Sequence, residues 1–416
     1  VLPQGQLDVR TGAEVLVGPD VLAVGADTAR VELIVYGDLS VGVSGQGQTV
    51  FRSAAADPQP GDWQGIVLQP TASVYLRSVH IDHARYGLLA EKLDQTITLE
   101  DVAIRRVSED GIRLENIEEE VIFNRVQVEE AEGVGIWIAG SGLMRINQAE
   151  LRDNGRAGLW REGGYLSLLN TRFNANGLAV PEEANLVLGR GTRGKVESNS
   201  FAGGIGIFCV ETREVEIEAN ALYNHEVGLW ARSARPRIVR NQFFRNALAM
   251  RMEGSVVPAR LVLNGVQEGE QLIDNQTNQP LQAINNWWGN DDESWIAARI
   301  SGDVNWRPFL NFDPRIPLNF ALGQNYPNPF NVGTQIDYQI GINDPIVSGQ
   351  TTVELEVRTL TGGLVRHLVE GLAAPGLYST SWDGRDERGE RVASGMYYYV
   401  LRIGPIAHAK KMIFIK

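Results

Sequence analysis

The chain is poor in cysteine, in cationic charge and in long apolar runs. Its 416 residues include a single cysteine, Cys209, so no disulfide can form within the chain and the fold must rest on packing. No apolar run approaches the roughly 20 residues that a membrane-spanning helix needs. Acidic residues exceed basic ones and the net charge is −13, which argues against nucleic acid as a partner.

The negative charge is unevenly distributed along the sequence. Acidic and basic residues are equal in number from Ala321 to Lys416, so the whole excess lies in the preceding part. The first residue is Val1, which fits either removal of a signal peptide or a shortened chain, and both interpretations stay open.

Helical periodicity is also absent, whereas a short pattern recurs about every 23 residues. The pattern is a glycine followed by aliphatic residues at alternate positions. Its copies begin at Gly65, Gly87, Gly111, Gly135, Gly158, Asn185, Gly206, Gly228 and Ala247. Each copy has a second half of alternating apolar residues, such as Ile97-Thr-Leu99, followed by a polar residue and a further apolar position at Ile104. This period of two predicts short strands with one buried face.

Short strands at this spacing predict a solenoid in which each coil pairs in parallel with the next, at about 4.8 Å per coil. The pattern resembles the right-handed parallel β-helix family over about residues 5–310. The segments "GAEVLVGPDVLAVG" and "INNWWGNDDES" are similar to the opening and closing segments of such proteins. We expect the repeat glycine to form the turn, the next residue to point inward, and Cys209 to lie in the core.

The residue two positions after the repeat glycine is expected to point outward. These positions are Val67, Leu89, Arg113, Trp137, Trp160, Val187, Phe208, Trp230 and Ala249. We call the set from Leu89 to Trp230 the outer stripe. An apolar stripe on the outside of a solenoid is rarely left exposed to water, and three explanations of what contacts it stay open. A long loop or the folded-back C-terminal sandwich covers it, it forms a subunit interface, or it stacks sugar rings with help from Arg113, Arg161 and Glu162.

Other candidate sites carry less chemistry. "HIDH", with His80, Asp82 and His83, offers metal-ligand atoms but no partner groups on neighbouring coils. Acidic residues near Glu118 and Glu130 lack the spacing of a calcium loop. The sequence has no GxSxG, HExxH or phosphate-binding loop. We therefore assign no catalytic residue, no metal site and no cofactor, and we leave enzymatic activity open with a non-enzyme favoured.

The last hundred residues differ in character. After Asp313 the repeat stops, and "QNYPNPFN" precedes about seven strand-like runs that predict a small β-sandwich. The motifs "NYPNPFN", "WDGRDERGERVASGMYYYVLR" and "KKMIFIK" resemble the C-terminal sorting domain of the type IX secretion system, in its flagellar-hook-cap-like Ig form. The residues that carry the motif are Asn325, Tyr326, Pro327, Asn328, Pro329, Phe330, Asn331, Trp382, Asp383 and Gly384. The resemblance implies export across an outer membrane, whereas a plain linker is the alternative for "NYPNPFN".

The sequence thus predicts an all-β protein. Residues 1–312 form a right-handed parallel β-helix solenoid, 313–323 a linker and 324–416 an Ig-like sorting domain. We expect an extracellular or outer-surface protein with a structural or interaction role, which associates with itself through the outer stripe or the C-terminal domain. Its partners are then further copies, the cell surface and the export machinery. The alternative is a protein that binds or degrades an extracellular polysaccharide.

Overall fold

The computed structural model describes residues 2, 4–18, 30–42, 47–177, 183–256, 260–311, 321–340, 351–373, 376–404 and 406–415. The chain divides into two compact units, Val1–Asn311 and Phe312–Lys416. Most of the expected linker lies outside the described residues, and its last part, Ala321–Leu322, forms strand β35 of the second unit.

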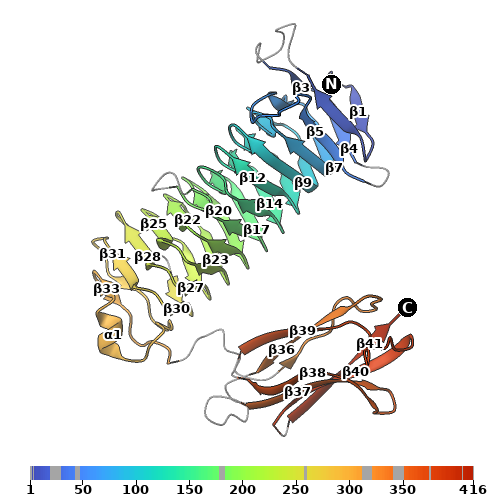
Figure 1. Ribbon diagram of the computed structural model, residues 1–416. Helices are drawn as coiled ribbons and strands as arrows, with labels where there is room; N and C mark the ends of the chain where they lie inside the picture. Colours follow the sequence, from blue (N-terminus) through green and yellow to red (C-terminus); the bar gives the residue numbers. More distant parts are fainter. Residues whose placement is uncertain are drawn as a thin grey trace. The chain divides into compact units, whose positions relative to one another are not determined.

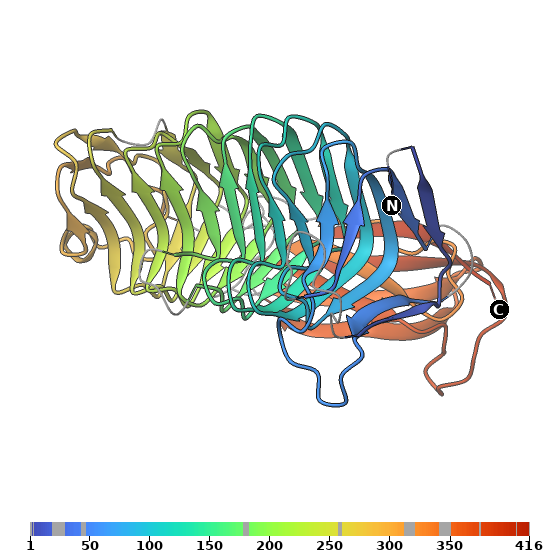
Figure 2. The same ribbon diagram turned by 90° about the horizontal axis from the view of Figure 1, so that it is seen from above.

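The first unit is a parallel β-helix, as predicted, and its coils follow one another in Figures 1 and 2. Each regular coil supplies one strand to a 12-stranded sheet and two to a 20-stranded sheet. We call the first the B sheet. Its strands are β3 (Glu32–Val35), β6 (Gly65–Leu68), β8 (Leu88–Ala90), β10 (Ile112–Leu114), β13 (Ile136–Ala139), β16 (Leu159–Glu162), β19 (Leu186–Leu188), β22 (Ile205–Val210), β25 (Val227–Arg232), β28 (Leu248–Glu253), β31 (Gln271–Asn275) and β33 (Ile300–Ser301).

The second sheet, the A sheet, has two ladders that meet at a corner. Its first ladder contains β1 (Gln6–Val9), β4 (Asp38–Val41), β7 (Ser73–Asp82), β9 (Ile97–Val107), β11 (Val121–Asn124), β14 (Leu143–Asn147), β17 (Tyr165–Leu169), β20 (Arg193–Glu197), β23 (Val215–Glu218), β26 (Arg237–Val239) and β29 (Arg260–Val262). The long strands β7 and β9 continue into the second ladder, which adds β2 (Glu14–Val17), β5 (Thr49–Ser53), β12 (Gln127–Ala131), β15 (Glu150–Arg152), β18 (Arg172–Asn174), β21 (Ser200–Ala202), β24 (Ala221–Tyr223), β27 (Gln242–Phe244) and β30 (Gly265–Gln267).

The corner between the two ladders is built from residues with positive φ. Ten successive coils place a non-glycine residue there, with φ between 50° and 57°. They are Ser78, Asp101, Arg125, Gln148, Asn170, Ser198, Ala219, Arg240, Leu263 and Asn285. The left-handed conformation bends the chain sharply, so in most coils the expected second half becomes two strands, whereas β7 and β9 continue through the bend as single strands.

Buried asparagines stabilise this corner from the inside. Asn199, Asn220, Asn241, Asn264 and Asn286 each directly follow a corner residue and are at most 3% exposed. In each step the Oδ1 atom accepts hydrogen bonds from the backbone N–H and the Nδ2 of the preceding asparagine, as from Asn220 to Asn241 at 3.0 and 2.9 Å. The ladder satisfies backbone groups that a tight turn would otherwise leave buried and unpaired.

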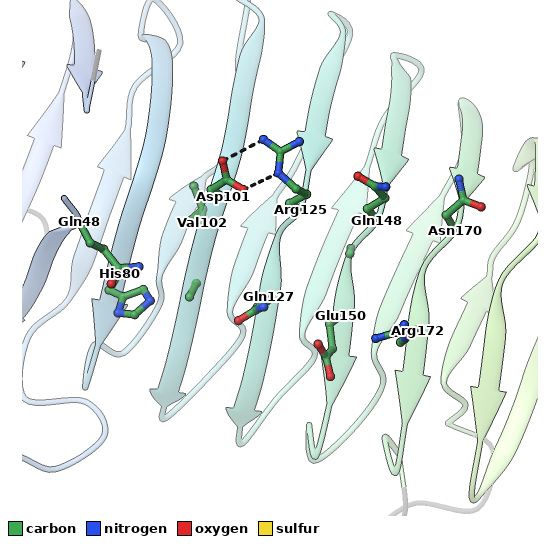
Figure 3. A pocket seen from close by; sticks show the side chains of 12 residues that line it. Gln48, His80, Asp101, Val102, Arg125, Gln127, Gln148, Glu150, Asn170 and Arg172 are labelled. Carbon is green, nitrogen blue, oxygen red and sulfur yellow. Dashed lines mark hydrogen bonds and ion pairs between the residues drawn. The ribbon is translucent and has the colours of Figure 1, made fainter. Parts of the chain in front are cut away.

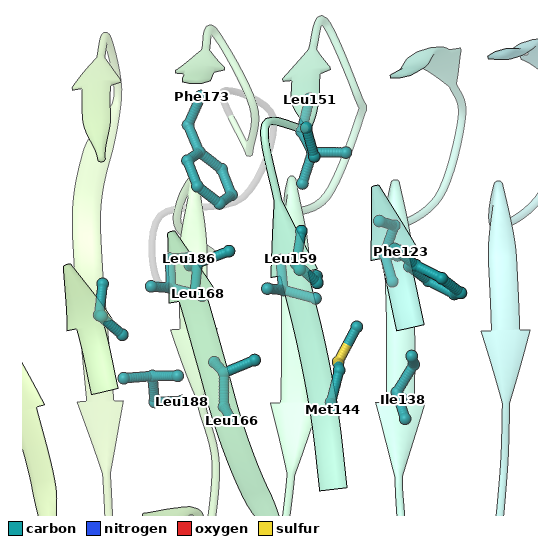
Figure 4. Packing of buried hydrophobic residues seen from close by; sticks show 14 of the residues in the cluster. Phe123, Ile138, Met144, Leu151, Leu159, Leu166, Leu168, Phe173, Leu186 and Leu188 are labelled. Carbon is teal, nitrogen blue, oxygen red and sulfur yellow. The ribbon is translucent and has the colours of Figure 1, made fainter. Parts of the chain in front are cut away.

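The core is one continuous cluster of inward aliphatic and aromatic side chains. Figure 4 shows Leu159, Leu166, Leu186 and Leu188 from neighbouring coils packed into its columns. Cys209 lies in the same column as Leu188 and is fully buried, as predicted, and burial raises the pKa of its thiol to about 12. Such columns bury apolar area on every coil, which supplies the main stabilisation of a solenoid.

The prediction for the repeat glycine is wrong at most positions. Gly228 lies inside strand β25 and is absent from the residues with positive φ. A Cβ atom there would approach the Ala249 carbonyl oxygen and the Phe243 ring at 2.8 Å. Gly111 and Gly206 meet similar obstacles in the next coil. The glycine is therefore needed for close approach between coils rather than for a turn.

The C-terminal end of the first unit contains a short α-helix, α1 (Glu293–Ala297), which the sequence pattern did not predict. Its N-cap is Asp292, whose Oδ1 accepts a hydrogen bond from the Ser294 N–H at 2.8 Å. Strands β32 (Leu281–Gln282) and β34 (Val304–Asn305) pair beside it. Trp288, from the closing segment, is fully buried.

The second unit has two antiparallel sheets, which agrees with the predicted small sandwich. One sheet contains β35, β36 (Thr334–Ile340) and β39 (Gly376–Trp382). The other, which we call the G sheet, contains β38 (Leu364–Ala373), β37 (Thr351–Thr359), β40 (Gly395–Ile403) and β41 (Ile406–Phe414). Its core is separate from that of the first unit and includes Trp382, Tyr399 and Phe414.

Candidate functional site

The outer stripe forms one row across the B sheet. Backbone pairing aligns Leu89 with Arg113, Trp137 and Trp160, and then Val187, Phe208 and Trp230. The register corrects the next position: Arg251 lies opposite Trp230, whereas Ala249 is fully buried. The outward residue of the last repeat is therefore Arg251, two positions later than expected. The repeat has Ala247 in place of the glycine, so the alignment on glycine misplaced it.

The stripe is less exposed than its sequence suggests. A second row of small and aliphatic residues packs against it, namely Val134, Ala157, Ala184, Ile205, Val227 and Leu248. Val187 and Phe208 are buried at 1% and 6% exposure, and Trp137, Trp160 and Trp230 are half-buried. The sheet thus carries a small hydrophobic cluster on its outer face, distinct from the solenoid core.

Arginine side chains cover the aromatic rings of the stripe. The Arg113 guanidinium lies 4.3 Å from the centre of the Trp137 ring, and Arg232 and Arg251 lie 4.9 and 5.1 Å from that of Trp230. Contacts of this kind contribute about 0.5–1 kcal/mol each when exposed, and more when desolvated. Arginines of the B sheet itself therefore provide part of the cover that the stripe needs, rather than the long loop or folded-back sandwich named in the first expectation.

The two residues expected to assist sugar stacking beside Trp160 differ in direction. Arg161 points into the core, at 1% exposure, and its guanidinium donates to the carbonyl oxygens of Gly140 and Gly142 at 3.1 and 2.7 Å. Burial lowers the pKa of Arg161 to about 10. The expectation for Arg161 is therefore wrong, because the alternation of the strand turns it inward, whereas Glu162 is exposed.

A second feature, which the sequence did not reveal, is a groove on the outside of the A sheet. Its volume is about 680 Å³ and it runs along the corner between the two ladders, as Figure 3 shows. We call it the corner groove. Its floor is formed by Val102, Ala103 and Ala149, which are at most 5% exposed. Its polar lining comes from successive coils and consists of Gln48, His80, Asp101, Arg125, Gln127, Gln148, Glu150, Asn170 and Arg172.

The second-ladder register explains the polar row in this groove. His80 pairs with Ala103, which is followed by Gln127, Glu150 and Arg172 on the next coils. A small alanine between longer side chains creates the depression. No uniform residue type marks these positions, since Ala103, Ala221 and Gly265 also lie two positions after a corner residue, and the corner itself was visible only in the structure.

Several polar groups of the groove face solvent without a protein partner. Among the described residues, no hydrogen bond or ion pair is found for the side chains of Gln148, Glu150 and Arg172. By contrast, Asp101 binds Arg125 through both carboxylate oxygens. Burial, and next the charge of Arg105, lower the pKa of His80. The groove thus offers an acid, a cation, an amide and a histidine that is neutral at neutral pH.

The "HIDH" segment does not assemble a metal site. His80 lies in the corner groove, whereas Asp82 lies near the Arg106 guanidinium at 3.5 Å. Burial, and next the charge of Arg106, lower the pKa of His83. Among the acidic residues that follow, Glu129 is 6% exposed and accepts a hydrogen bond from Arg152 at 2.6 Å. Arginines therefore pair with Asp82 and Glu129.

The residues of the "NYPNPFN" motif belong to the folded second unit rather than to a linker, and Asn325 and Phe330 are buried in it. Phe330 is 3% exposed and its ring centre lies 5.6 Å from that of Trp382. Asn325 is buried and donates from its backbone N–H to the Tyr399 hydroxyl at 2.9 Å. The Asn328 Oδ1 accepts from the Ile413 N–H. Tyr326, Pro327, Pro329 and Asn331 are exposed.

A tight turn follows Trp382. Asp383 accepts a hydrogen bond from the Arg385 N–H at 3.1 Å. Gly384 has φ 72°, and a Cβ atom there would lie 2.7 Å from the Phe414 ring. Both conditions require glycine at this position.

The chain has the fold of a right-handed parallel β-helix protein with an appended Ig-like domain. Residues 64–243 match the family model described as a right handed beta helix region, and residues 339–402 match that of the FlgD Ig-like domain. A search of the curated proteins finds no match.

Solved structures with a related fold include the A-module of mannuronan C-5 epimerase AlgE4 from Azotobacter vinelandii. Identity is 15%, the TM-score is 0.45, and the match covers 74% of this chain and 90% of that one. Tailspike protein 2 of an Escherichia coli O157:H7 bacteriophage has 9% identity and a TM-score of 0.38. The match covers 92% of this chain and 64% of the tailspike chain. An alginate lyase from Paenibacillus has 10% identity and a TM-score of 0.30. The match covers 72% of this chain and 99% of the lyase chain. At these values the likeness concerns the general architecture and carries no argument about activity.

Proposed function

We propose that the protein binds an extended, uncharged glycan along the corner groove. The observation that carries this proposal is the row of unpartnered polar side chains, Gln148, Glu150 and Arg172, on adjacent coils. Sugar hydroxyls both donate and accept hydrogen bonds, so a mixture of acid, cation and amide suits them. Successive coils rise by about 4.8 Å, which is close to the length that one sugar unit adds to an extended chain.

The charge of the groove favours a neutral glycan over an acidic one. Asp101 and Arg125 neutralise each other, and the remaining charged groups that line the groove are Glu150 and Arg172, of opposite sign. An anionic polymer would find one cation there that is unpaired among the described residues, Arg172. The excess of acidic residues in the part of the chain before Ala321 would repel it. The proposed ligand is therefore rich in hydroxyls and poor in carboxylates.

Binding is favoured over hydrolysis by the state of the carboxylates. A glycoside hydrolase needs two carboxyl groups across the scissile bond, one of them free to act as an acid. In the corner groove the carboxylates are Asp101 and Glu150, and Asp101 is held in a bidentate ion pair with Arg125. The lining thus retains one free carboxylate, which suits recognition.

The test is binding of soluble neutral polysaccharides by affinity electrophoresis, with alginate and polygalacturonate as anionic comparisons. Glu150→Ala and Arg172→Ala are each expected to weaken binding about tenfold, the effect of losing one or two hydrogen bonds of about 1 kcal/mol. Arg240→Ala is the matched control, since Arg240 is an exposed corner residue beyond the groove. Retention of full binding in both groove variants, or preferred binding of the anionic polymers, would overturn the proposal.

We also propose that the protein acts outside the cell or on its outer surface, and that the second unit is read by export machinery. The support is the resemblance of the sorting motif together with the integration of Phe330 and Trp382 into one folded core. In a bacterium with type IX secretion, removal of residues 324–416 should keep the β-helix inside the cell. Normal export of the shortened chain would contradict this role.

Self-association was expected through the outer stripe or the second unit, and it stays a proposal. The arginine cover over Trp137 and Trp230 weighs against the stripe as the contact surface. Exposed apolar residues of the second unit are the remaining candidate contact surface for self-association.

A further inference from the structure

The G sheet of the second unit carries a cluster of charged side chains on one face. Glu354 and Glu356 alternate along β37, so both point to the same side. His367 on β38 pairs with Glu356, and Arg402 on β40 pairs with Glu354. We call Glu354, Glu356 and His367 the His367 cluster.

A β-bulge brings the histidine onto this face. The pairing between β37 and β38 runs from Leu355 with Val369 directly to Glu356 with His367, so Leu368 is left out of the register. Without this irregularity Glu356 would face Leu368, and His367 would point to the other side of the sheet. Bulges of this kind re-aim single side chains and are over-represented at functional sites.

Three ligand atoms converge in the His367 cluster. The His367 Nε2 atom lies 3.3 Å from Glu356 Oε1 and 3.7 Å from Glu354 Oε1. Two ligands of a tetrahedral Zn²⁺, each about 2.0–2.2 Å from the metal, are about 3.3–3.6 Å apart. The two distances from His367 Nε2 are therefore close to the ligand spacing of a tetrahedral site, and all three atoms lie within 4.8 Å of one another.

The other ring nitrogen is held by a carboxylate. Glu387 Oε1 lies 3.0 Å from His367 Nδ1 and also accepts a hydrogen bond from the His367 backbone N–H. This carboxylate fixes Nδ1 as the protonated nitrogen, so in the neutral ring the Nε2 lone pair points at two carboxylate oxygens. That arrangement is repulsive unless a cation lies between them. A carboxylate behind a ligating histidine is the usual outer-shell arrangement of zinc sites.

The neighbouring arginines leave the converging atoms free. Arg358 Nε and Arg402 Nη1 both contact Glu356 Oε2, at 2.7 and 3.2 Å, whereas the oxygen nearest His367 Nε2 is Oε1. Arg402 also lies 3.7 Å from Glu354 Oε2. The three carboxylates lie among Arg358, Arg402 and Arg366, the last of which acts on Glu387, so a bound divalent ion would leave a net positive charge. We expect a site weaker than a structural zinc site for this reason.

We propose that Glu354, Glu356 and His367 bind a first-row divalent transition-metal ion, with Zn²⁺ as the prototype. Three protein ligands leave the fourth position of a tetrahedral ion to water or to a group from a partner. The imidazole nitrogen excludes Ca²⁺ and Mg²⁺ as preferred ions, because both prefer oxygen ligands. This site lies on the second unit and is independent of the proposed glycan binding.

The test is calorimetric titration of the full chain with ZnCl₂ in a buffer that does not chelate metals. One equivalent is expected to bind, and millimolar CaCl₂ should not compete. His367→Ala should lower the affinity at least about 100-fold, and Glu387→Gln about 10- to 100-fold, since it removes only the outer-shell carboxylate. His408→Ala is the matched control, because His408 is the exposed histidine of strand β41 in the same unit.

A spectroscopic measurement keeps the proposal falsifiable if a variant folds poorly. Co²⁺ bound to the full chain should show the intense visible absorption of a tetrahedral site, and Glu354→Gln should reduce it. A stoichiometric site that survives in His367→Ala, or its loss in His408→Ala, overturns the proposal. So does the absence of Zn²⁺ binding, which would mean that a proton on Nε2 supplies the balancing charge.

Discussion

At the scale of single residues, buried titratable groups give the clearest consequences. His225 follows a left-handed residue, Asn224, and is 2% exposed. Its ring nitrogens lie 2.9 and 3.0 Å from the carbonyl oxygens of Gly203 and Phe201. Burial lowers the pKa of His225 to about 4, although these carbonyl groups favour the protonated ring.

This pKa predicts a loss of stability in mild acid. A histidine with a lowered folded-state pKa binds its proton first in the unfolded chain, so stability falls as the pH falls from about 6.5 to about 4. The expected contribution is up to about 3 kcal/mol below pH 4. Asparagine occupies the position after the left-handed residue in other coils, as at Asn154 and Asn246, so His225→Asn should fold.

Urea unfolding of the wild type and of His225→Asn between pH 7 and pH 4 checks this prediction. The difference in unfolding free energy between the two chains should change steadily in favour of the variant as the pH falls. A difference that stays constant over this range would show that His225 does not titrate in the folded chain as its burial requires.

Residue directions were predictable from the sequence where backbone geometry alone decides them. Leu229 and Cys209 point inward and Trp230 outward because side chains alternate along a strand. The same rule predicts that Arg161, next to the outward Trp160, points inward. Our expectation that Arg161 assists sugar stacking did not apply this rule. Its burial depends on carbonyl oxygens of the adjacent coil, which no local pattern reveals.

At the scale of secondary-structure elements, the asparagine ladder couples each corner to the next. Asn241 donates from Nδ2 to the carbonyl oxygens of Ile217 and Val239 at 2.7 and 3.1 Å, and accepts twice from Asn220. Asn241→Ala would leave these groups buried without partners, at about 1–3 kcal/mol each. We expect a loss of at least about 3 kcal/mol in unfolding free energy.

The measurement is urea unfolding followed by tryptophan fluorescence. Asn170→Ala is the matched control, because Asn170 is an exposed corner residue whose side chain contacts Asn147. It should lower the stability by only about 1 kcal/mol, the cost of alanine in the left-handed conformation at φ 50°. Equal effects of the two substitutions would mean that the ladder adds nothing beyond ordinary polar contacts.

The elements also show where sequence reasoning ends. The repeat spacing predicted the coils because every coil must bury the same apolar columns. The corner groove depends on the bend between two ladders, and that bend is made by residues as different as Asp101, Ala219 and Leu263. The His367 cluster depends on a bulge between β37 and β38. Neither feature has a residue pattern of its own, so neither could be predicted from the sequence.

At the scale of the whole molecule, the two units have separate hydrophobic cores and different surfaces. The outer stripe of the first unit has no fully exposed residue, since arginines and a second apolar row cover it. In the second unit, Met396, Ile413 and Ile415 are exposed at 41%, 39% and 49%. Met396 on β40 pairs with Ile413 on β41, and Ile415 follows at the alternate position just after β41, so the three form one apolar patch at this edge of the G sheet.

This contrast predicts which surface mediates any self-association. An exposed apolar patch gains free energy when a second copy covers it, whereas the stripe would first have to release arginines from their carboxylates, such as Arg113 from Asp110 and Glu115. In light scattering, Trp160→Ser with Trp230→Ser should therefore leave the particle mass of the wild type unchanged. Ile413→Ser with Ile415→Ser should reduce that mass if the wild type exceeds a monomer. The opposite result, a mass that falls only when the tryptophans are replaced, would mean that the arginine cover opens and that the stripe is the contact surface.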